Sequence, residues 1–287
     1  MYKRQVSGAL NHNADITIDV ASGKTLTYSG ASLNLGANTL TLSGGGTLGN
    51  TNPIVLNNAD SKLLLNSITL GSASTSANSL GLDVDANSTV TSLSVGHITP
   101  VSIASGKTLS GAITVSGGSI KLDEAGTLAS SVSMSGGVLD ADETLTLSGA
   151  LTQSGNITID VADNKILTYS GASLNLGANT LTLSGEGRLS NTYVLGLNNA
   201  NSKLLLSGSI TVDRVSTSLA SLGLDVDDDS TVTSLSVGHT TPVSIATGKS
   251  LSGAVTVTAG SIKLGEAGTL ASTISVSYTH LTLPTKA

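Results

Sequence analysis

Apolar and polar residues alternate along most of the chain. Leucine, isoleucine and valine occupy every second position of short runs, and threonine, serine, asparagine and lysine fill the positions between them. A period of two places successive side chains on opposite faces of a β-strand, so each run predicts a strand with one buried face. No run shows the apolar stripe of an amphipathic helix. We expect strands at 16–20, 25–28, 32–35, 39–42, 89–95, 101–103, 112–115 and 119–122.

The spacing of these runs predicts how the strands are assembled. Turn residues separate the runs, and strand centres recur about every seven residues, which is closer than in sandwiches or barrels. Three strands at this spacing make a coil of roughly 20 residues, the scale of one β-solenoid turn. Stacked coils would pair their strands in parallel, with ladders of inward aliphatic residues along the axis. We therefore predict an all-β parallel β-helix with roughly three short strands per coil and no substantial helix.

The sequence also repeats itself at an offset of 141 residues. Leu26–Gly44 returns unchanged as Leu167–Gly185, and Ser88–His97 returns as Ser230–His239 after one inserted residue. Near-identical tandem units indicate an array in which each unit stacks on the next. At the predicted coil length, one unit would hold about seven coils.

The repeat divides the chain into two continuous units. We assign 6–149 to a first β-solenoid unit and 150–277 to a second, incomplete unit of the same solenoid. The inserted residue falls beside Gly208, between two alternating runs. Inside a strand it would move every following side chain to the opposite face, so we expect it in a turn.

Both ends of the chain depart from the repeat. Residues 1–5 (MYKRQ) and 278–287 (YTHLTLPTKA) have no counterpart in it. They resemble the two translated orientations of a transposon end used to prepare sequencing libraries. We expect both segments to be non-native flanks of a fragment of a longer gene, which makes the missing secretion signal uninformative.

Composition narrows the classes of protein that remain. The chain has no Cys, Trp or Phe, and 11% of its residues are charged. Abundant aliphatic residues argue against a disordered tract and indicate an aliphatic core. The net charge of −6 becomes −9 without Lys3, Arg4 and Lys286, leaving 10 basic against 19 acidic residues. Such a surface suits neither nucleic acid nor an anionic membrane, and no apolar stretch is long enough to span a bilayer.

Two acidic turns resemble the start of a calcium loop. They place oxygen ligands at alternate positions, as a hard cation requires, but serine replaces the loop's glycine and its final glutamate. The other interpretation is a polar turn between two strands. We predict no other metal or cofactor site. The calcium candidates are Asp83, Asp85 and Asn87 in the first unit, and Asp225, Asp227 and Asp229 in the second.

Other candidate chemistry is sparse. His97 and His239 occur once per unit between glycine and a following proline, which indicates a turn. A lyase-like enzyme on a β-helix would need clustered carboxylates with a basic residue, yet Arg188 and Arg214 have no counterpart in the first unit. We therefore predict no catalytic residues and no enzyme. Outward threonine pairs such as Thr25 and Thr27 favour either ordinary exposed strands or, as a minor alternative, an ice-binding face.

Several runs resemble a known group of proteins. TLTLSGGGTL (39–48), TLTLSGALT (144–152) and the GTL motifs at 126–128 and 268–270 are similar to the repeats of bacterial autotransporter passengers and filamentous-haemagglutinin-like adhesins. The resemblance covers most of 6–277. It implies a right-handed parallel β-helix, export to the bacterial cell surface, and a stalk or adhesive role.

The resulting hypothesis is a structural or adhesive rod segment of a large secreted or surface-anchored bacterial protein. Its expected partner is an unidentified surface ligand, either a glycan or a host or cell-surface protein. The alternative is a carbohydrate-active β-helix that binds or cleaves a polysaccharide. Because a solenoid without caps exposes unpaired strand edges, we also expect the fragment to associate end to end.

Overall fold

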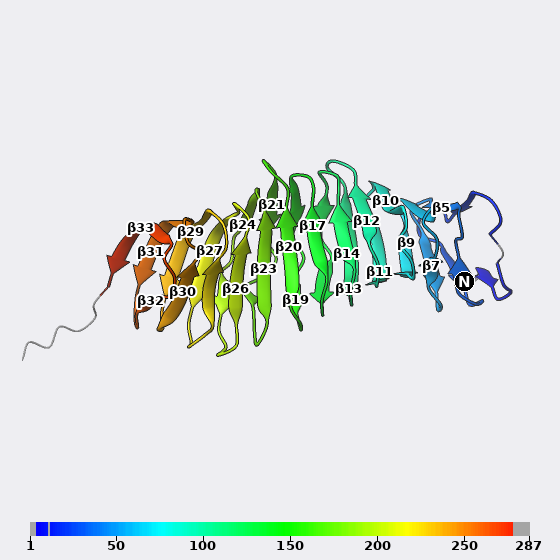
Figure 1. Cartoon of the computed structure of the whole chain (residues 1–287). Helices are drawn as coiled ribbons and strands as arrows, with labels where there is room; N and C mark the ends of the chain where they lie inside the picture. Colours follow the sequence, from blue (N-terminus) through cyan, green and yellow to red (C-terminus); the bar gives the residue numbers. More distant parts are fainter. Residues whose placement is uncertain (1–3, 11, 278–287) are drawn as a thin grey trace, which may run out of the picture.

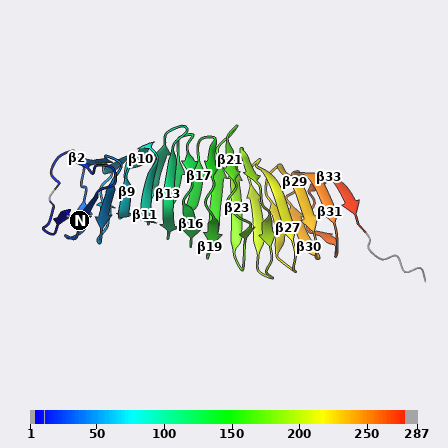
Figure 2. The same ribbon diagram turned by 180° about the vertical axis from the view of Figure 1, so that it is seen from behind.

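The alternating runs form short strands that lie across the long axis of a rod. A computed structural model describes residues 4–10 and 12–277, which run from one end of the rod to the other, blue to red in Figure 1. The view from behind shows the same stack of coils (Figure 2). No helix occurs in these ranges, so the predicted all-β parallel solenoid is confirmed. The segment 278–287 and residues 1–3 of the predicted flanks lie outside the described residues.

Two sheets of 13 and 20 strands form the walls of the solenoid, and their ladders are parallel. The smaller sheet consists of β2 (Ile16–Asp19), β5 (Thr39–Ser43), β8 (Lys62–Asn66), β10 (Gly81–Ala86), β12 (Thr99–Ile103), β14 (Ser119–Leu122), β17 (Val138–Ala141), β20 (Ile157–Val161), β23 (Thr180–Gly185), β26 (Lys203–Ser207), β28 (Gly223–Val226), β30 (Thr241–Ile245) and β32 (Ile262–Leu264).

The larger sheet consists of β1 (Arg4–Val6), β3 (Thr25–Tyr28), β4 (Leu33–Asn34), β6 (Thr47–Asn50), β7 (Ile54–Leu56), β9 (Thr69–Thr75), β11 (Ser88–Val95), β13 (Thr108–Val115), β15 (Thr127–Leu128), β16 (Ser131–Met134), β18 (Leu145–Leu147), β19 (Leu151–Gln153), β21 (Ile166–Tyr169), β22 (Leu174–Asn175), β24 (Arg188–Asn191), β25 (Leu195–Leu197), β27 (Thr211–Thr217), β29 (Ser230–Val237), β31 (Ser250–Val257) and β33 (Thr269–Val276).

Each coil crosses the smaller sheet once and the larger sheet once or twice. β5, β6 and β7 make a coil of three strands, as predicted, whereas β8 is followed by a single long strand, β9. β9 pairs with β6 through Thr69 and with β7 through Ala73, so two short strands of one coil continue as one strand in the next. Register offsets between neighbouring coils range from 19 residues (Leu63 to Leu82) to 24 (Ile16 to Leu40).

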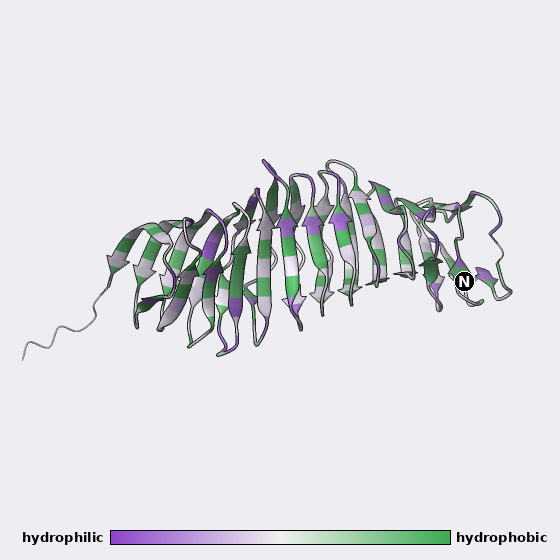
Figure 3. Cartoon of the chain, viewed as in Figure 1, coloured by the Kyte–Doolittle hydropathy of each residue, from purple (hydrophilic) through white to green (hydrophobic). Residues whose placement is uncertain are grey.

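Inward aliphatic residues form ladders along the axis. Leu40, Leu63, Leu82 and Val101 are consecutive register partners on the smaller sheet, and all four side chains are buried. Apolar bands accordingly alternate with polar ones along the strands in Figure 3. Burial of each such side chain stabilises the fold by roughly 1.5–3 kcal/mol.

The core is not purely aliphatic, which corrects the expectation from composition. Tyr28 and Tyr169 occupy the same position of the two units, and both side chains are buried. The Tyr169 hydroxyl Oη accepts hydrogen bonds from the backbone nitrogens of Leu151 (3.1 Å) and Ala172 (3.2 Å). A buried tyrosine is tolerated because its hydroxyl satisfies backbone donors that the sheet ladder leaves free.

The residue inserted in the second unit lies in a turn, as predicted. β26 ends at Ser207 and β27 begins at Thr211, whereas in the first unit β8 ends at Asn66 and β9 begins at Thr69. Gly208 has φ of +143°, a conformation that favours glycine. The turn absorbs the extra residue, so the inward faces of both flanking strands are unchanged.

Candidate functional site

A row of hydroxyl groups follows the larger sheet on its outward face. Thr25, Thr47, Thr69, Thr89 and Ser110 are consecutive register partners in neighbouring coils. Partners in parallel strands lie about 4.8 Å apart, so the row is regularly spaced. A flat row of this kind is what an ice-binding face would require.

The smaller sheet does not extend such a face. Thr39 and Thr41 in β5 are register partners of Lys62 and Leu64 in β8. A charged and an apolar side chain therefore interrupt the threonine positions after one coil. The extended hydroxyl rows thus lie on the larger sheet, where a second row of register partners consists of Ser74, Ser94, Thr114, Ser133 and Thr152.

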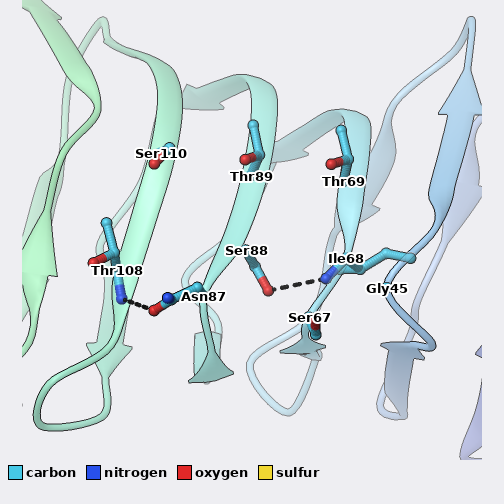
Figure 4. A pocket seen from close by; sticks show the side chains of 9 residues that line it. All are labelled: Gly45, Ser67, Ile68, Thr69, Asn87, Ser88, Thr89, Thr108 and Ser110. Atoms are coloured by element: carbon cyan, nitrogen blue, oxygen red, sulfur yellow. Dashed lines mark hydrogen bonds between the residues drawn. The ribbon is translucent and has the colours of Figure 1, made fainter. Parts of the chain in front are cut away.

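Part of this row lines a surface pocket of about 390 Å³. Figure 4 shows Thr69, Thr89 and Ser110 side by side on neighbouring strands. The turn below them satisfies its own polar groups: Asn87 Oδ1 accepts from Thr108 N (3.0 Å), and Ser88 Oγ donates to Ala86 O (2.9 Å). The three hydroxyls of the row have no hydrogen bond within the described protein, so they are available to a neutral polar ligand.

The calcium candidates lie on strands of the smaller sheet and in the turns that follow them. Asp83 and Asp225 are each paired with a lysine of the preceding coil, Lys62 and Lys203, at 2.5 Å. Asn87 is bonded to the next coil, and Asp229 Oδ1 accepts from Ser250 N at 2.8 Å. Asp85 and Asp227 are exposed.

These contacts show how the acidic side chains of the calcium candidates are paired. Among residues 4–10 and 12–277, no three His, Cys, Asp or Glu side chains form a group suited to a metal ion. The predicted oxygen ligands are instead divided between lysine partners, backbone amides and solvent. Calcium binding therefore stays a prediction without a cluster to support it.

The structure brings together a group of charges that the sequence did not reveal. Lys121 on β14 forms ion pairs with Asp140 on β17, at 3.7 Å, and with Asp142 just beyond that strand. Asp140 is also the register partner of Asp160 on β20. These residues are one coil apart in sequence, and only the register of the three strands shows that they are neighbours.

The protonation of this group follows from its surroundings. Burial, with the nearby Asp142 carboxylate, raises the pKa of Asp140 above its ordinary value. The hydrogen bond with Asp142 raises the pKa of Lys121, so the lysine is a cation at neutral pH. Carboxylates beside a protonated lysine resemble the acid–base pairs of carbohydrate-active enzymes, but a cationic lysine cannot serve as a general base.

A second acidic group lies beside the calcium candidates. Burial, followed by the carboxylates of Asp83, Asp123 and Asp85, raises the pKa of Glu124. Ser102 Oγ donates to Asp123 Oδ1 at 2.6 Å. Lys62 partly offsets the repulsion among these groups. Both acidic groups therefore lie on strands of the smaller sheet and in the turns that follow them, and each has a lysine nearby.

The histidines lie in turns, as their neighbours in sequence predict. His97 and His239 are exposed, and their carbonyl oxygens accept from Thr99 Oγ1 (3.1 Å) and Thr241 Oγ1 (2.9 Å). These threonines are buried and close the turn at the start of β12 and β30. Neither imidazole is part of a cluster of metal-ligating residues among those described.

The fold defines the chain as a parallel β-solenoid. Comparison with family models, with curated proteins and with solved structures finds no match. The part of the chain that is described contains no helix with the length and hydropathy of a membrane span.

Proposed function

We propose that this chain is a structural and adhesive rod segment of a large secreted or surface-anchored bacterial protein. The observation that carries the proposal is the unbroken pairing of both sheets along the whole described chain. Each coil is joined to the next by parallel hydrogen-bonded ladders and by the aliphatic core. A body built in this way resists bending and stretching along its axis.

The near-identity of the two units supports a role in which length matters. The second unit repeats most of the strands and turns of the corresponding part of the first, including the buried tyrosine at the same position. A spacer gains reach by adding coils, because each new coil contacts only its neighbours. At about 4.8 Å per coil, the 13 strands of the smaller sheet correspond to roughly 60 Å of rod.

Export and surface attachment rest on the resemblance of the repeats to autotransporter passengers and filamentous-haemagglutinin-like adhesins. A carbohydrate-active β-helix is the second candidate, favoured by the group of Lys121, Asp140 and Asp160. Release of new reducing ends from a panel of polysaccharides, abolished in Asp140→Asn, would establish the second candidate.

Force spectroscopy tests the rod directly. With handles near residues 4 and 277, we expect stepwise ruptures, each releasing one or a few coils of roughly 70 Å contour length. Leu183→Asp places an unpaired charge in the buried ladder of β23 and should lower the rupture force. Extension of the unmodified chain without resistive steps would overturn the proposal.

A further inference from the structure

The two units serve as an internal comparison, and several of their differences lie close together on the larger sheet. The chain has arginines at positions 4, 188 and 214 only. Arg188 and Arg214 are 26 positions apart, yet both line the same surface pocket of about 430 Å³ on the larger sheet. At the matching positions the first unit has Thr47 and Ser72. A net-negative chain has thus placed two of its three arginines together, in one unit alone.

Two further substitutions organise this pocket. Asp213 replaces Gly71, and Arg188 Nε donates to its Oδ1 at 2.9 Å, with Nη2 at 2.8 Å from the same oxygen. Ser190, which replaces Gly49, donates from Oγ to Asp213 Oδ2 at 2.9 Å. The carboxylate of Asp213 is therefore held on both oxygens by residues that changed together with it.

The backbone beneath the pocket is common to both units. Asn191 Nδ2 donates to Tyr193 O (2.7 Å) and Arg214 O (2.8 Å), and its Oδ1 accepts from Arg214 N (3.2 Å). Asn50 makes the same bridge in the first unit, donating to Ser72 O and accepting from Ser72 N. The scaffold is shared, so the difference lies in the side chains that it presents.

Arg214 is the unpaired member of the group. Its guanidinium is exposed, and no ion pair or hydrogen bond of that guanidinium exists among the described residues. Tyr193, which replaces Asn52, is 48% exposed, and its backbone carbonyl accepts from the same Asn191 amide nitrogen as that of Arg214. The Arg214 guanidinium therefore leaves one positive charge open to a ligand at the pocket, and the exposed Tyr193 directly precedes Val194, which lines the pocket wall.

The rim of the pocket carries hydroxyl groups. Thr233, Ser234 and Ser236 of β29 line it together with Val194 and the two arginines. We infer that this arginine patch (Arg188, Tyr193, Asp213, Arg214 and the three hydroxyl residues) binds an acidic glycan. The sugar carboxylate pairs with Arg214, a sugar face packs on Tyr193, and the β29 hydroxyls bond the sugar hydroxyls.

The strands around the patch favour a glycan over an acidic peptide. An extended peptide would bind most simply by adding a strand to a free sheet edge. β24 is already paired with β21 and β27, and β27 is paired with β24, β25 and β29. No backbone edge is open here, so recognition must use side chains, which suits a sugar.

Calorimetry with oligogalacturonate tests the assignment, with a neutral galactose oligomer of equal length as control. We expect saturable binding of the acidic oligomer alone. Arg214→Ser and Tyr193→Asn, which restore the residues of the first unit, should weaken it, the arginine change by about ten- to a hundred-fold. Arg214→Lys should recover part of the loss, because a lysine keeps the charge but not the planar fork.

Lys263→Ser is the matched control, since it removes one exposed positive charge from the smaller sheet, away from the patch. It should leave affinity unchanged. Three outcomes would each overturn the assignment. They are an equal loss of affinity in Lys263→Ser and Arg214→Ser, no binding of oligogalacturonate, and binding of polyglutamate as tight as that of oligogalacturonate. The inference rests on the adhesive part of the proposed function. Its failure would leave the stepwise mechanical unfolding of the rod unaffected.

Discussion

Asn191→Ala offers a sharp test of how one side chain supports two coils. The Asn191 side chain is 2% exposed and makes four hydrogen bonds to backbone groups of the loop after β24 and of β27. Its amide nitrogen donates at 2.7 and 2.8 Å, and its oxygen accepts at 3.1 and 3.2 Å. Alanine would remove all four hydrogen bonds and leave their backbone partners unpaired.

The expected cost follows from these bonds. A typical hydrogen bond contributes a net 0.5–1.5 kcal/mol, roughly, and a buried backbone group left unpaired costs more. Water that hydrogen-bonds to the unpaired backbone groups would lower the total cost of losing four bonds. We therefore expect Asn191→Ala to lower the free energy of unfolding by about 2–4 kcal/mol. Asn50→Ala in the first unit should act similarly, because Asn50 makes the corresponding bridge at 2.6–2.9 Å.

Urea unfolding followed by circular dichroism gives the stability change, and hydrogen exchange locates it. Loss of protection should concentrate on 188–217, the strands that the amide joins. Asn201→Ala is the matched control, because Asn201 is exposed and its side chain has no hydrogen bond among the described residues. A cost below about 0.5 kcal/mol, or one equal to that of Asn201→Ala, would refute this reasoning.

Three further predictions concern charge, backbone and assembly. Because burial raises the pKa of Asp140, the charged form of this side chain destabilises the folded state at pH 7. Asp140→Asn should therefore raise the melting temperature at pH 7. The gain should vanish as the pH falls below about 4, the pKa of the unfolded-state carboxyl group. Gly111→Ala should lower the free energy of unfolding in urea by about 1–3 kcal/mol, because Gly111 has φ of +124° and an added Cβ would clash with a backbone oxygen. Gly49→Ala is the control, because a Cβ at Gly49 would meet no atom within 4 Å. Ile274 on β33, the last described strand of the larger sheet, is 51% exposed. Ile274→Lys should reduce concentration-dependent association in sedimentation experiments, because a charge would disfavour pairing at this strand edge. A wild-type chain that stays monomeric would contradict the prediction of association through exposed strand edges.

Much of the candidate site lay beyond the reach of sequence reasoning. Alternation placed Lys121 on the outward face of the strand expected at 119–122, but its ion pair with Asp140 required the register between β14 and β17. Arg188 and Asp213 lie on strands whose separation in sequence includes the inserted residue. The spacing of the coils was the available signal for pairing residues in neighbouring coils. Because the register offset varies from 19 to 24 residues, this spacing leaves several pairings open for each residue.

The sequence by itself determined the local features of this protein. Alternation specified the strands and their buried faces, because side chains on a strand point to opposite sides with a period of two. The repeat located the insertion in a turn, because a slip inside a strand would expose the core. Only the tertiary structure decided which outward side chains meet. The ladder hydrogen bonds are alike in every register, so neighbours across coils depend on the length of each corner and on how the core fills.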